Sequence, residues 1–166
     1  MQFLRSSGQE RAEMMRSLEE MPGRLRAAFA ELDGEDAVSP GPGGAFSPVE
    51  QAWHLADLER EGFGFRIEAL LSEENPFLPD FDGTLVAQQR NYRGRSLEEG
   101  LEAFAIARRH NIDVLKAIEM SSWSRAGQQE GIGEVTLCDI PGFMLQHDRA
   151  HETEIGDWTR ARRQAR

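Results

Sequence analysis

The sequence predicts an all-α protein, a four-helix bundle with one long crossover connection. Four long segments repeat apolar residues at helical spacing, and glycine and proline cluster between them. Only Glu134–Leu137 is a candidate strand, and a short one. About two dozen residues connect the second and third helical segments, which is long for a bundle and favours a wall or lid of a binding site. Residues 1–166 are expected to form a single domain with its own core.

The first helical segment is the least regular of the four. It runs from about Gln9 to Leu32, with an approximate apolar stripe. Pro22-Gly23 lies inside it and predicts a kink or a break, because proline removes a backbone donor and clashes with the preceding turn. The stretch Asp33–Phe46 is rich in glycine and proline and is expected to be a loop.

Each of the other three helices starts with a Ser or Thr followed three residues later by an acidic residue. This pattern caps helix N-termini, because the two side chains can bind otherwise unpaired backbone N–H groups. The pairs are Ser47 and Glu50, Ser96 and Glu99, and Thr136 and Asp139. The second helix is expected to continue to about Leu71, and the third to reach Ile118.

Composition excludes several classes of protein. The net charge of −10, from 29 acidic and 19 basic residues, repels phosphate backbones and argues against nucleic-acid binding. No apolar run approaches the roughly 18–20 residues that span a bilayer, and the N-terminal residues lack the pattern of a secretory signal. The single cysteine, Cys138, excludes an internal disulfide and a cysteine-based zinc site. We therefore expect a cytoplasmic protein with no membrane partner.

Three of the four histidines lie where they could share one metal ion. His147 and His151 are four residues apart in the last helix, so their imidazoles stack on one face about one turn apart. They fall on the apolar stripe of that helix, and His54 lies in the second helix. His110 lacks both a paired histidine and a clear apolar stripe. The sequence therefore predicts a metal site formed by His54, His147 and His151.

A buried imidazole without a partner costs on the order of 1–3 kcal/mol, so these side chains need partners. A shared metal is one solution. The alternative is that each histidine binds a carboxylate or carbonyl group in the core. Asp57 and Glu61 near His54, and Asp148 and Glu154 near the helix-four pair, are candidates to hold the second ring nitrogens, although any one of them could instead belong to a solvated helix face.

Three neutral imidazoles suit zinc, nickel, copper or ferrous iron better than magnesium or calcium. They also leave coordination positions open, and three protein ligands plus water is the pattern of catalytic zinc. Such an ion can polarise a carbonyl group, lower the pKa of water toward ~7, or activate a thiolate. The sequence leaves open whether the fourth position takes water or a protein ligand, and it assigns no catalytic residue.

Other catalytic arrangements are poorly supported. The sequence has no GxSxG motif and no phosphate-binding loop. Cys138 lies near the start of the last helix, where a thiolate would be favoured, but a small buried apolar role is the better interpretation. Candidates to line a substrate pocket are Trp53, Phe65, Arg90, Tyr92 and Arg93.

Two segments carry a family resemblance: SPVEQAWHLADLERE, which contains His54, and MLQHDRAHETEI, which contains His147 and His151. With the FDG and SLEEGLEAF segments between them, the chain resembles the DinB-like superfamily, the group that includes the YfiT-type proteins. The resemblance implies an up-down four-helix bundle with a long crossover, one divalent metal such as zinc or nickel on the three histidines, and frequent homodimers. It also implies that some relatives use low-molecular-weight thiols in S-transfer or isomerisation.

Three classes of function remain open. The first is a metal-dependent transferase or hydrolase that activates a thiol cosubstrate or water for reaction with a small molecule. The second is a non-catalytic, stress-related dimer that binds a metal or a ligand. The third is a purely structural bundle with histidines in its core.

Overall fold

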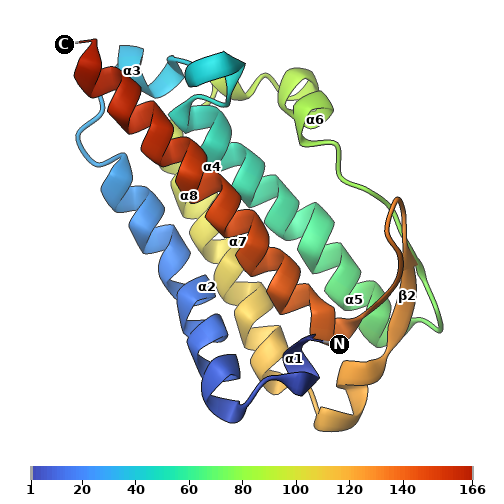
Figure 1. The fold of residues 1–166 in the computed structure, drawn as a ribbon. Helices are drawn as coiled ribbons and strands as arrows, with labels where there is room; N and C mark the ends of the chain where they lie inside the picture. Colours follow the sequence, from blue (N-terminus) through green and yellow to red (C-terminus); the bar gives the residue numbers. More distant parts are fainter. Residues whose placement is uncertain (1, 166) are drawn as a thin grey trace.

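The computed structural model describes residues 2–165 and confirms the four-helix bundle with a long crossover. The bundle consists of α2 (Gly8–Ala28), a continuous second unit, α7 (Leu97–Ala117) and α8 (Ile140–Gln164). The second unit joins α4 (Pro48–Asp57), the π-helix η2 (Leu58–Gly64) and α5 (Phe65–Ser72). In Figure 1, α2 and α8 run in one direction, and the second unit and α7 run in the other. Two successive bundle helices therefore share a direction, which is why a long crossover connects them.

Shorter elements form the connections. The first three are α1 (Gln2–Arg5), α3 (Gly34–Val38) and the 3-10 turn η1 (Pro42–Gly44). The crossover contains β1 (Phe77–Leu78), α6 (Gly83–Gln89) and η3 (Tyr92–Gly94). Between α7 and α8 lie η4 (Met120–Ser124), β2 (Ala126–Gln129), β3 (Gly133–Thr136) and η5 (Leu137–Asp139). The expected loop at Asp33–Phe46 is thus partly helical.

A small sheet, which the sequence did not predict, packs beside one end of the bundle (Figure 1). Its strand order is β1-β2-β3. Strand β1 pairs in parallel with β2, placing Phe77 opposite Gln128, and β2 pairs antiparallel with β3, placing Gly127 opposite Val135. The candidate strand at Glu134–Leu137 corresponds to β3, whereas β1 and β2 were missed because two to four residues carry too little periodicity to reveal a strand.

The predicted caps account for where the helices begin. The Glu50 carboxylate accepts hydrogen bonds from the backbone N–H and the hydroxyl of Ser47, at 2.9 and 2.7 Å. The Ser96 hydroxyl accepts from the backbone N–H of Glu99, but no reciprocal bond from the Glu99 side chain occurs in the described chain, so this is a simple N-cap. The Thr136–Asp139 pair caps the 3-10 turn η5, which leads directly into α8, and not α8 itself: the Asp139 carboxylate accepts from the Thr136 backbone N–H at 2.9 Å.

Of the two alternatives predicted at Pro22, a kink or a break, the break does not occur. Helix α2 continues through this residue and ends at Ala28, where Phe29 takes the C-cap position. The side chains around Pro22 supply the reason: Met21 and Leu25 are almost completely buried against the bundle, and this packing outweighs the single backbone hydrogen bond that proline removes.

The bundle core has two apolar halves with a polar layer between them. Leu18, Leu70 and Met144 belong to the half near the sheet, and Leu55, Phe104 and Ile155 belong to the other. Between Met144 and Ile155, helix α8 presents Asp148 and His151 to the interior; between Phe104 and Ile112, helix α7 presents Arg108. Buried polar groups require partners, so this layer is where a functional site is expected.

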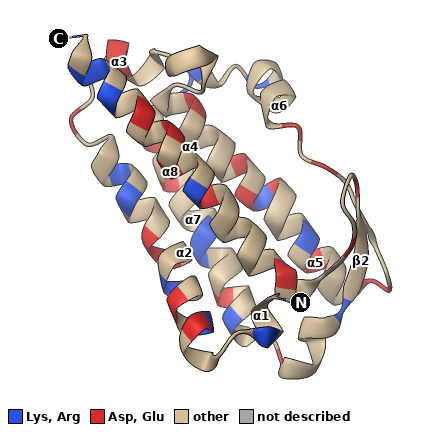
Figure 2. Cartoon of the chain, viewed as in Figure 1, with Lys and Arg blue, Asp and Glu red and all other residues tan. Residues whose placement is uncertain are grey.

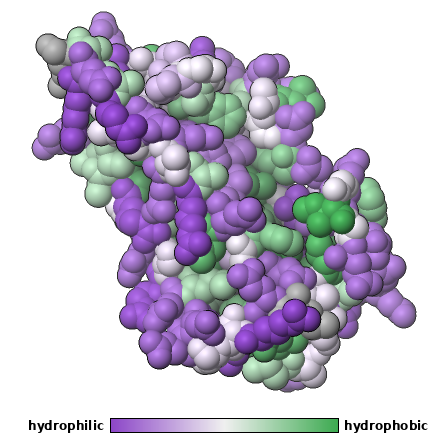
Figure 3. Space-filling view, in the orientation of Figure 1, coloured by the Kyte–Doolittle hydropathy of each residue, from purple (hydrophilic) through white to green (hydrophobic). Residues whose placement is uncertain are grey.

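The surface agrees with the expectations from composition. Acidic and basic residues are interspersed along α2 and α8, and no extended basic area is visible on the face in Figure 2. Hydrophilic residues cover most of the same face in Figure 3, where apolar side chains form only scattered spots. Among residues 2–165, no helix is both long enough and apolar enough to cross a membrane.

Candidate metal centre

The structure brings the three predicted histidines together in the polar layer, between α4 and α8. His54 and His147 approach each other with their Nε2 atoms 3.3 Å apart, and the Nε2 atoms of His147 and His151 are 3.0 Å apart. His54 and His151 are each only 7 % exposed, while His147 is half-buried and provides the more open side. Helical spacing explains the pair on α8, and the facing of α4 and α8 supplies the third imidazole.

One ring nitrogen of the site has a fixed protonation state. The Glu154 carboxylate accepts a hydrogen bond from the Gln51 amide nitrogen at 2.7 Å, which turns the Gln51 carbonyl oxygen toward His151. That oxygen lies 2.5 Å from His151 Nδ1, and a Glu154 carboxylate oxygen lies 3.3 Å from the same atom. Two acceptors at Nδ1 require an N–H there, so in its neutral, metal-binding form His151 directs the Nε2 lone pair toward the other two rings.

The three Nε2 atoms cannot all be satisfied by one another. Each neutral imidazole carries one N–H and one lone pair, and the His151 lone pair already faces inward. A proton on His147 Nε2 can point at only one of its two neighbours, and without it two lone pairs face each other at 3.0 Å. His54 Nδ1 is buried and has no hydrogen-bond partner among the described residues. A cation at the centre resolves this conflict, because it accepts all three lone pairs at once.

The spacing of the nitrogens fits a metal ion. Imidazole nitrogens about 2.0–2.1 Å from a tetrahedral zinc lie about 3.3 Å from each other. The observed separations are 3.0 and 3.3 Å, and the potential ligand atoms of the three residues all lie within 4.8 Å of one another. The donor set is neutral and nitrogen-based, so it suits a divalent transition metal.

Aromatic rings and the crossover enclose the site. The ring centroids of Phe46 and Phe81 lie 5.2 and 6.1 Å from that of His54, and the Phe63 centroid lies 6.0 Å from that of His147. Phe81 belongs to the crossover, as does Gly83, whose missing side chain leaves room for the imidazole of His54. The long connection therefore walls the site, as the sequence predicted.

Alanine at position 83 tests this close packing. A Cβ atom there would lie 2.4 and 2.5 Å from Cε1 and Nδ1 of His54, so the ring has to move. Gly83→Ala is expected to weaken zinc affinity about 10- to 100-fold, the usual range for disturbing the support of a ligand, with far-UV circular dichroism unchanged. Competition with a chromophoric chelator measures the affinity. Gly23→Ala, at a position with no atom within 4 Å, is the control, and equal affinities of the two variants would contradict the packing argument.

Burial keeps the imidazoles of His54 and His147 neutral. Desolvation, reinforced by the neighbouring His151, lowers the pKa of His54 to about 3. Desolvation, together with His151, His54 and Arg108, lowers the pKa of His147 to about 2. The hydrogen bond from His151, with a further one from Gln51, lowers the pKa of Glu154 to about 2 against the opposing effect of burial. All three groups therefore adopt the charge states that metal binding requires.

These shifts predict an acid-labile metal-free protein. An unfolded histidine titrates near 6.5, so between that pH and about 3 the unfolded chain binds protons that folded His54 and His147 do not bind. Stability is therefore complete above about pH 6.5 and falls as pH decreases, by up to about 1.4 kcal/mol per pH unit for each histidine. Urea midpoints of the metal-free protein at pH 7.5 and 5.0 measure the loss. The dependence of the urea midpoint on pH should be weaker in His147→Gln than in wild type. A wild-type midpoint that is the same at both pH values would contradict the lowered pKa values of the two histidines.

The acidic residues proposed around the histidines have different roles. Only Glu154 contacts a ring nitrogen of the site. The Asp57 carboxylate binds Arg60, Arg90 and Tyr92, and Glu61 also binds Arg90. Although their spacing from His54 places Asp57 and Glu61 near the same helix face, both carboxylates pair with Arg90 of the crossover instead of His54, so these two predictions were wrong.

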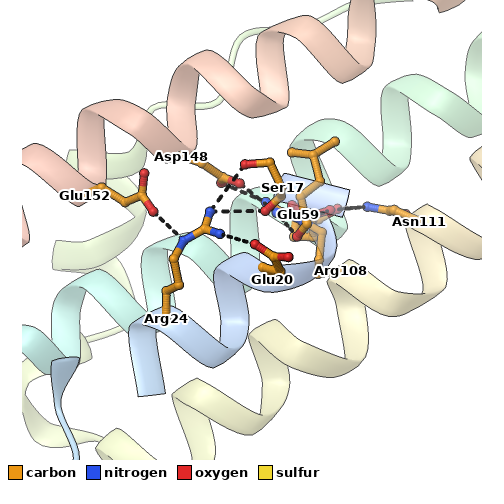
Figure 4. Close-up of polar contacts among 9 residues, drawn as sticks. Ser17, Glu20, Arg24, Glu59, Arg108, Asn111, Asp148 and Glu152 are labelled. Atoms are coloured by element: carbon orange, nitrogen blue, oxygen red, sulfur yellow. Dashed lines mark hydrogen bonds and ion pairs between the residues drawn. The ribbon is translucent and has the colours of Figure 1, made fainter. Parts of the chain in front are cut away.

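The prediction for Asp148 was also wrong, because its carboxylate belongs to a buried ion cluster with Arg108 (Figure 4). Two Arg108 nitrogens donate to its two carboxylate oxygens at 2.8 Å each, and Arg108 also donates to the Leu18 carbonyl at 2.9 Å. Glu59, from the π-helix, completes an ion pair with Arg108 at 3.0 Å. One guanidinium thus joins all four bundle units beside the histidines.

Two of the residues suggested as pocket lining, Tyr92 and Arg93, line a pocket that Phe46 also lines. The five residues also have contacts or positions of their own in the surrounding structure. Trp53 donates to the Ser96 carbonyl at 2.9 Å, Arg93 pairs with Glu50, and Phe65 is 41 % exposed. Arg90 and Tyr92 bind Asp57. Cys138 is fully buried, as expected. Sequence reasoning missed Gln51, although its position one turn before His54 on α4 was an available signal.

Fold and site together define a helical bundle with a three-histidine centre of the kind that holds a metal between facing helices. The chain belongs to the DinB superfamily, whose model matches residues 17–155. The matched region includes all three histidines and Glu154, so the resemblance noted from the sequence is confirmed.

Among solved structures, the chain is similar to YfiT from Bacillus subtilis, described as a probable metal-dependent hydrolase with an unusual four-helix bundle topology. The TM-score is 0.85 at 18 % identity, over 94 % of this chain and 89 % of that one. At this identity the likeness establishes the fold. No curated protein matches the sequence.

Proposed function

We propose that this chain is a metal-dependent enzyme in which His54, His147 and His151 hold one divalent transition metal ion, zinc or nickel. The observation that carries the proposal is the convergence of three Nε2 atoms, 3.0 and 3.3 Å apart, in a pattern that hydrogen bonds cannot satisfy. The third open interpretation, a structural bundle with core histidines, leaves this conflict unresolved.

Three protein ligands leave room for a reacting molecule, and a metal bound there would supply an activated water or thiolate at neutral pH. The chain itself contributes orientation and desolvation. Gln51 and Glu154 fix the tautomer of His151, and the rings of Phe46, Phe63 and Phe81 limit the access of bulk water. The only thiol of the chain, that of Cys138, is fully buried, so the nucleophile would come from outside the chain.

Hydrolysis of a small molecule is the first reaction to test. The description of YfiT as a probable metal-dependent hydrolase supports water as the nucleophile. S-transfer with a low-molecular-weight thiol is the second, and it rests on the family resemblance. The test incubates zinc- and nickel-loaded protein with ester and amide panels and with thiol–electrophile pairs. Metal-dependent turnover lost in His54→Ala supports the proposal, and absence of turnover with both metals in every panel contradicts it.

A non-catalytic dimer is the alternative function. Phe77 and Ile132, in the sheet region, are 64 and 60 % exposed, and burial of such side chains between two copies would stabilise a homodimer. A cytoplasmic location belongs to the same proposal. Light scattering of the purified protein tests the dimer, and reversible ligand binding without turnover would favour this alternative over the enzyme.

A further inference from the structure

Charged contacts tie the crossover to the bundle at the far end of α6. Arg90, the C-cap residue of that helix, donates to Asp57 at 2.6 Å. It also donates to both carboxylate oxygens of Glu61 at 2.8 Å each. The Tyr92 hydroxyl donates to the same Asp57 oxygen as Arg90, at 2.6 Å. Arg90 is therefore the charged link between the end of α6 and the second helical unit, beside the buried apolar cluster that Ala87 forms with Val49 and Trp53.

The carboxylate that receives Arg90 is completely buried. Burial of an ionised carboxylate is costly unless its oxygens are paired, and Asp57 pairs with Arg60, Arg90 and Tyr92. Arg90 thus binds a fixed point on α4, one turn beyond His54. A fixed partner makes this contact more rigid than a pair between two flexible surface side chains.

The other end of α6 presses against the metal site. Gly83 begins the helix and contacts the His54 ring, and Phe81 packs near the same ring. Just upstream, Glu130 accepts from the Asp80 backbone N–H at 3.0 Å, and Arg66 donates to the Pro79 carbonyl at 3.2 Å. The segment with Phe81 and Gly83, which forms the wall of the site, is therefore fixed at both of its ends. The contacts of Pro79 and Asp80 fix it on the N-terminal side, and Arg90 fixes it on the C-terminal side.

His54 depends on this wall more than His151 does. Gln51 and Glu154 fix the ring of His151 through its Nδ1 atom. His54 Nδ1 has no hydrogen-bond partner in the part of the chain described, so packing alone sets the orientation of that ring.

We propose that Arg90 is a positioning residue for the metal centre: by anchoring α6 to Asp57 and Glu61, it keeps Gly83 and Phe81 against His54 and so holds that imidazole ready to bind. The inference rests on the proposed function, because it concerns the same three ligands. Without Arg90, the seven-residue helix α6 loses its charged tie to α4 and keeps the apolar packing of Ala87 with Val49 and Trp53, so the His54 ring gains freedom that metal binding must then remove.

The test compares Arg90→Gln with Arg26→Gln. Arg26 is a matched control, because it also pairs with two carboxylates, those of Glu98 and Glu102, and is similarly exposed at 42 % against 37 %. Its contacts join α2 to α7, away from the crossover. Cobalt(II) affinity, the visible spectrum of the cobalt-loaded protein and amide hydrogen exchange of α6 in the metal-free protein are measured for both variants and for wild type.

We expect Arg90→Gln to bind cobalt about 3- to 10-fold more weakly than wild type, with an altered visible spectrum and faster exchange in α6. Arg26→Gln should match wild type in all three, and Arg90→Lys, which keeps the charge but loses the two-pronged contact, should fall between. Wild type that binds no cobalt overturns the proposed function itself. Wild type that binds, with Arg90→Gln identical to it in affinity and spectrum, overturns the positioning role alone.

Discussion

Replacing His147 and His151 together with alanine is expected to abolish metal binding and leave the bundle folded. The change removes two of the three converging Nε2 atoms and relieves their unsatisfied contacts, at 3.0 and 3.3 Å, in the metal-free protein. Disturbing only the support of a ligand already costs about 10- to 100-fold in affinity, so loss of two ligands should cost more than 100-fold. Elemental analysis and chelator competition measure the loss, and circular dichroism checks the fold.

The control for this variant is His110→Ala. His110 is exposed on α7 and stands apart from the three-histidine group. Its removal should leave the metal content and the affinity at wild-type values. If the double variant kept the metal of the wild-type protein, the ion would have to be held by other residues, and the assignment of the centre would be wrong.

Arg108→Met is expected to cause the largest loss of stability of any single change considered for this chain. The substitution leaves two buried carboxylates, those of Asp148 and Glu59, without their cation. Removing one partner of a buried ion pair typically costs about 3–5 kcal/mol, because a charge remains in the core without compensation. Urea unfolding followed by circular dichroism measures the change in the free energy of unfolding.

The control for this variant is Arg24→Met, which removes the other arginine labelled in Figure 4. Arg24 also binds two carboxylates, of Glu20 and Glu152, but its side chain is 38 % exposed, so its loss should cost about 1 kcal/mol or less. If the two variants were equally stable, the buried cluster would contribute no more than a surface ion pair. Because Asp148 directly follows His147, we also expect the loss of Arg108 to disturb the position of the His147 ligand.

The bundle and the histidines could be predicted from the sequence because both follow from helical periodicity. His147 and His151 had to share a face once Thr136 and Asp139 placed the start of the last helix. The small sheet could not be predicted, because β1 pairs with β2 across about 50 residues, as in the pairing of Phe77 with Gln128. Such pairings depend on the tertiary fold, and a strand of two to four residues is too short to show a recognisable pattern in the sequence.

The surroundings of the site were harder to predict than its ligands. Glu154 was identified correctly, whereas Asp57, Glu61 and Asp148 were not. Asp148 follows His147 directly, and a shift of one residue on a helix turns a side chain by about 100°. Asp57 and Glu61 pair with Arg90 of the crossover, a contact that the helix sequence does not reveal. The π-helix at Leu58–Gly64 adds a further rotation within the second unit, and its sequence has no feature that separates it from an α-helix. The direction of an acidic side chain is therefore set by packing that periodicity does not specify.

Titration of chelator-treated wild-type protein with zinc or cobalt tests the central claim most directly. Three Nε2 atoms that converge from one chain predict saturation at one metal ion per chain. At pH 7 the binding should release no proton from His54 or His147, because both are already neutral. Cobalt should give the visible absorption of a nitrogen-rich, four- or five-coordinate ion. A protein that bound neither ion at millimolar concentration, while retaining its helical circular dichroism, would contradict the account.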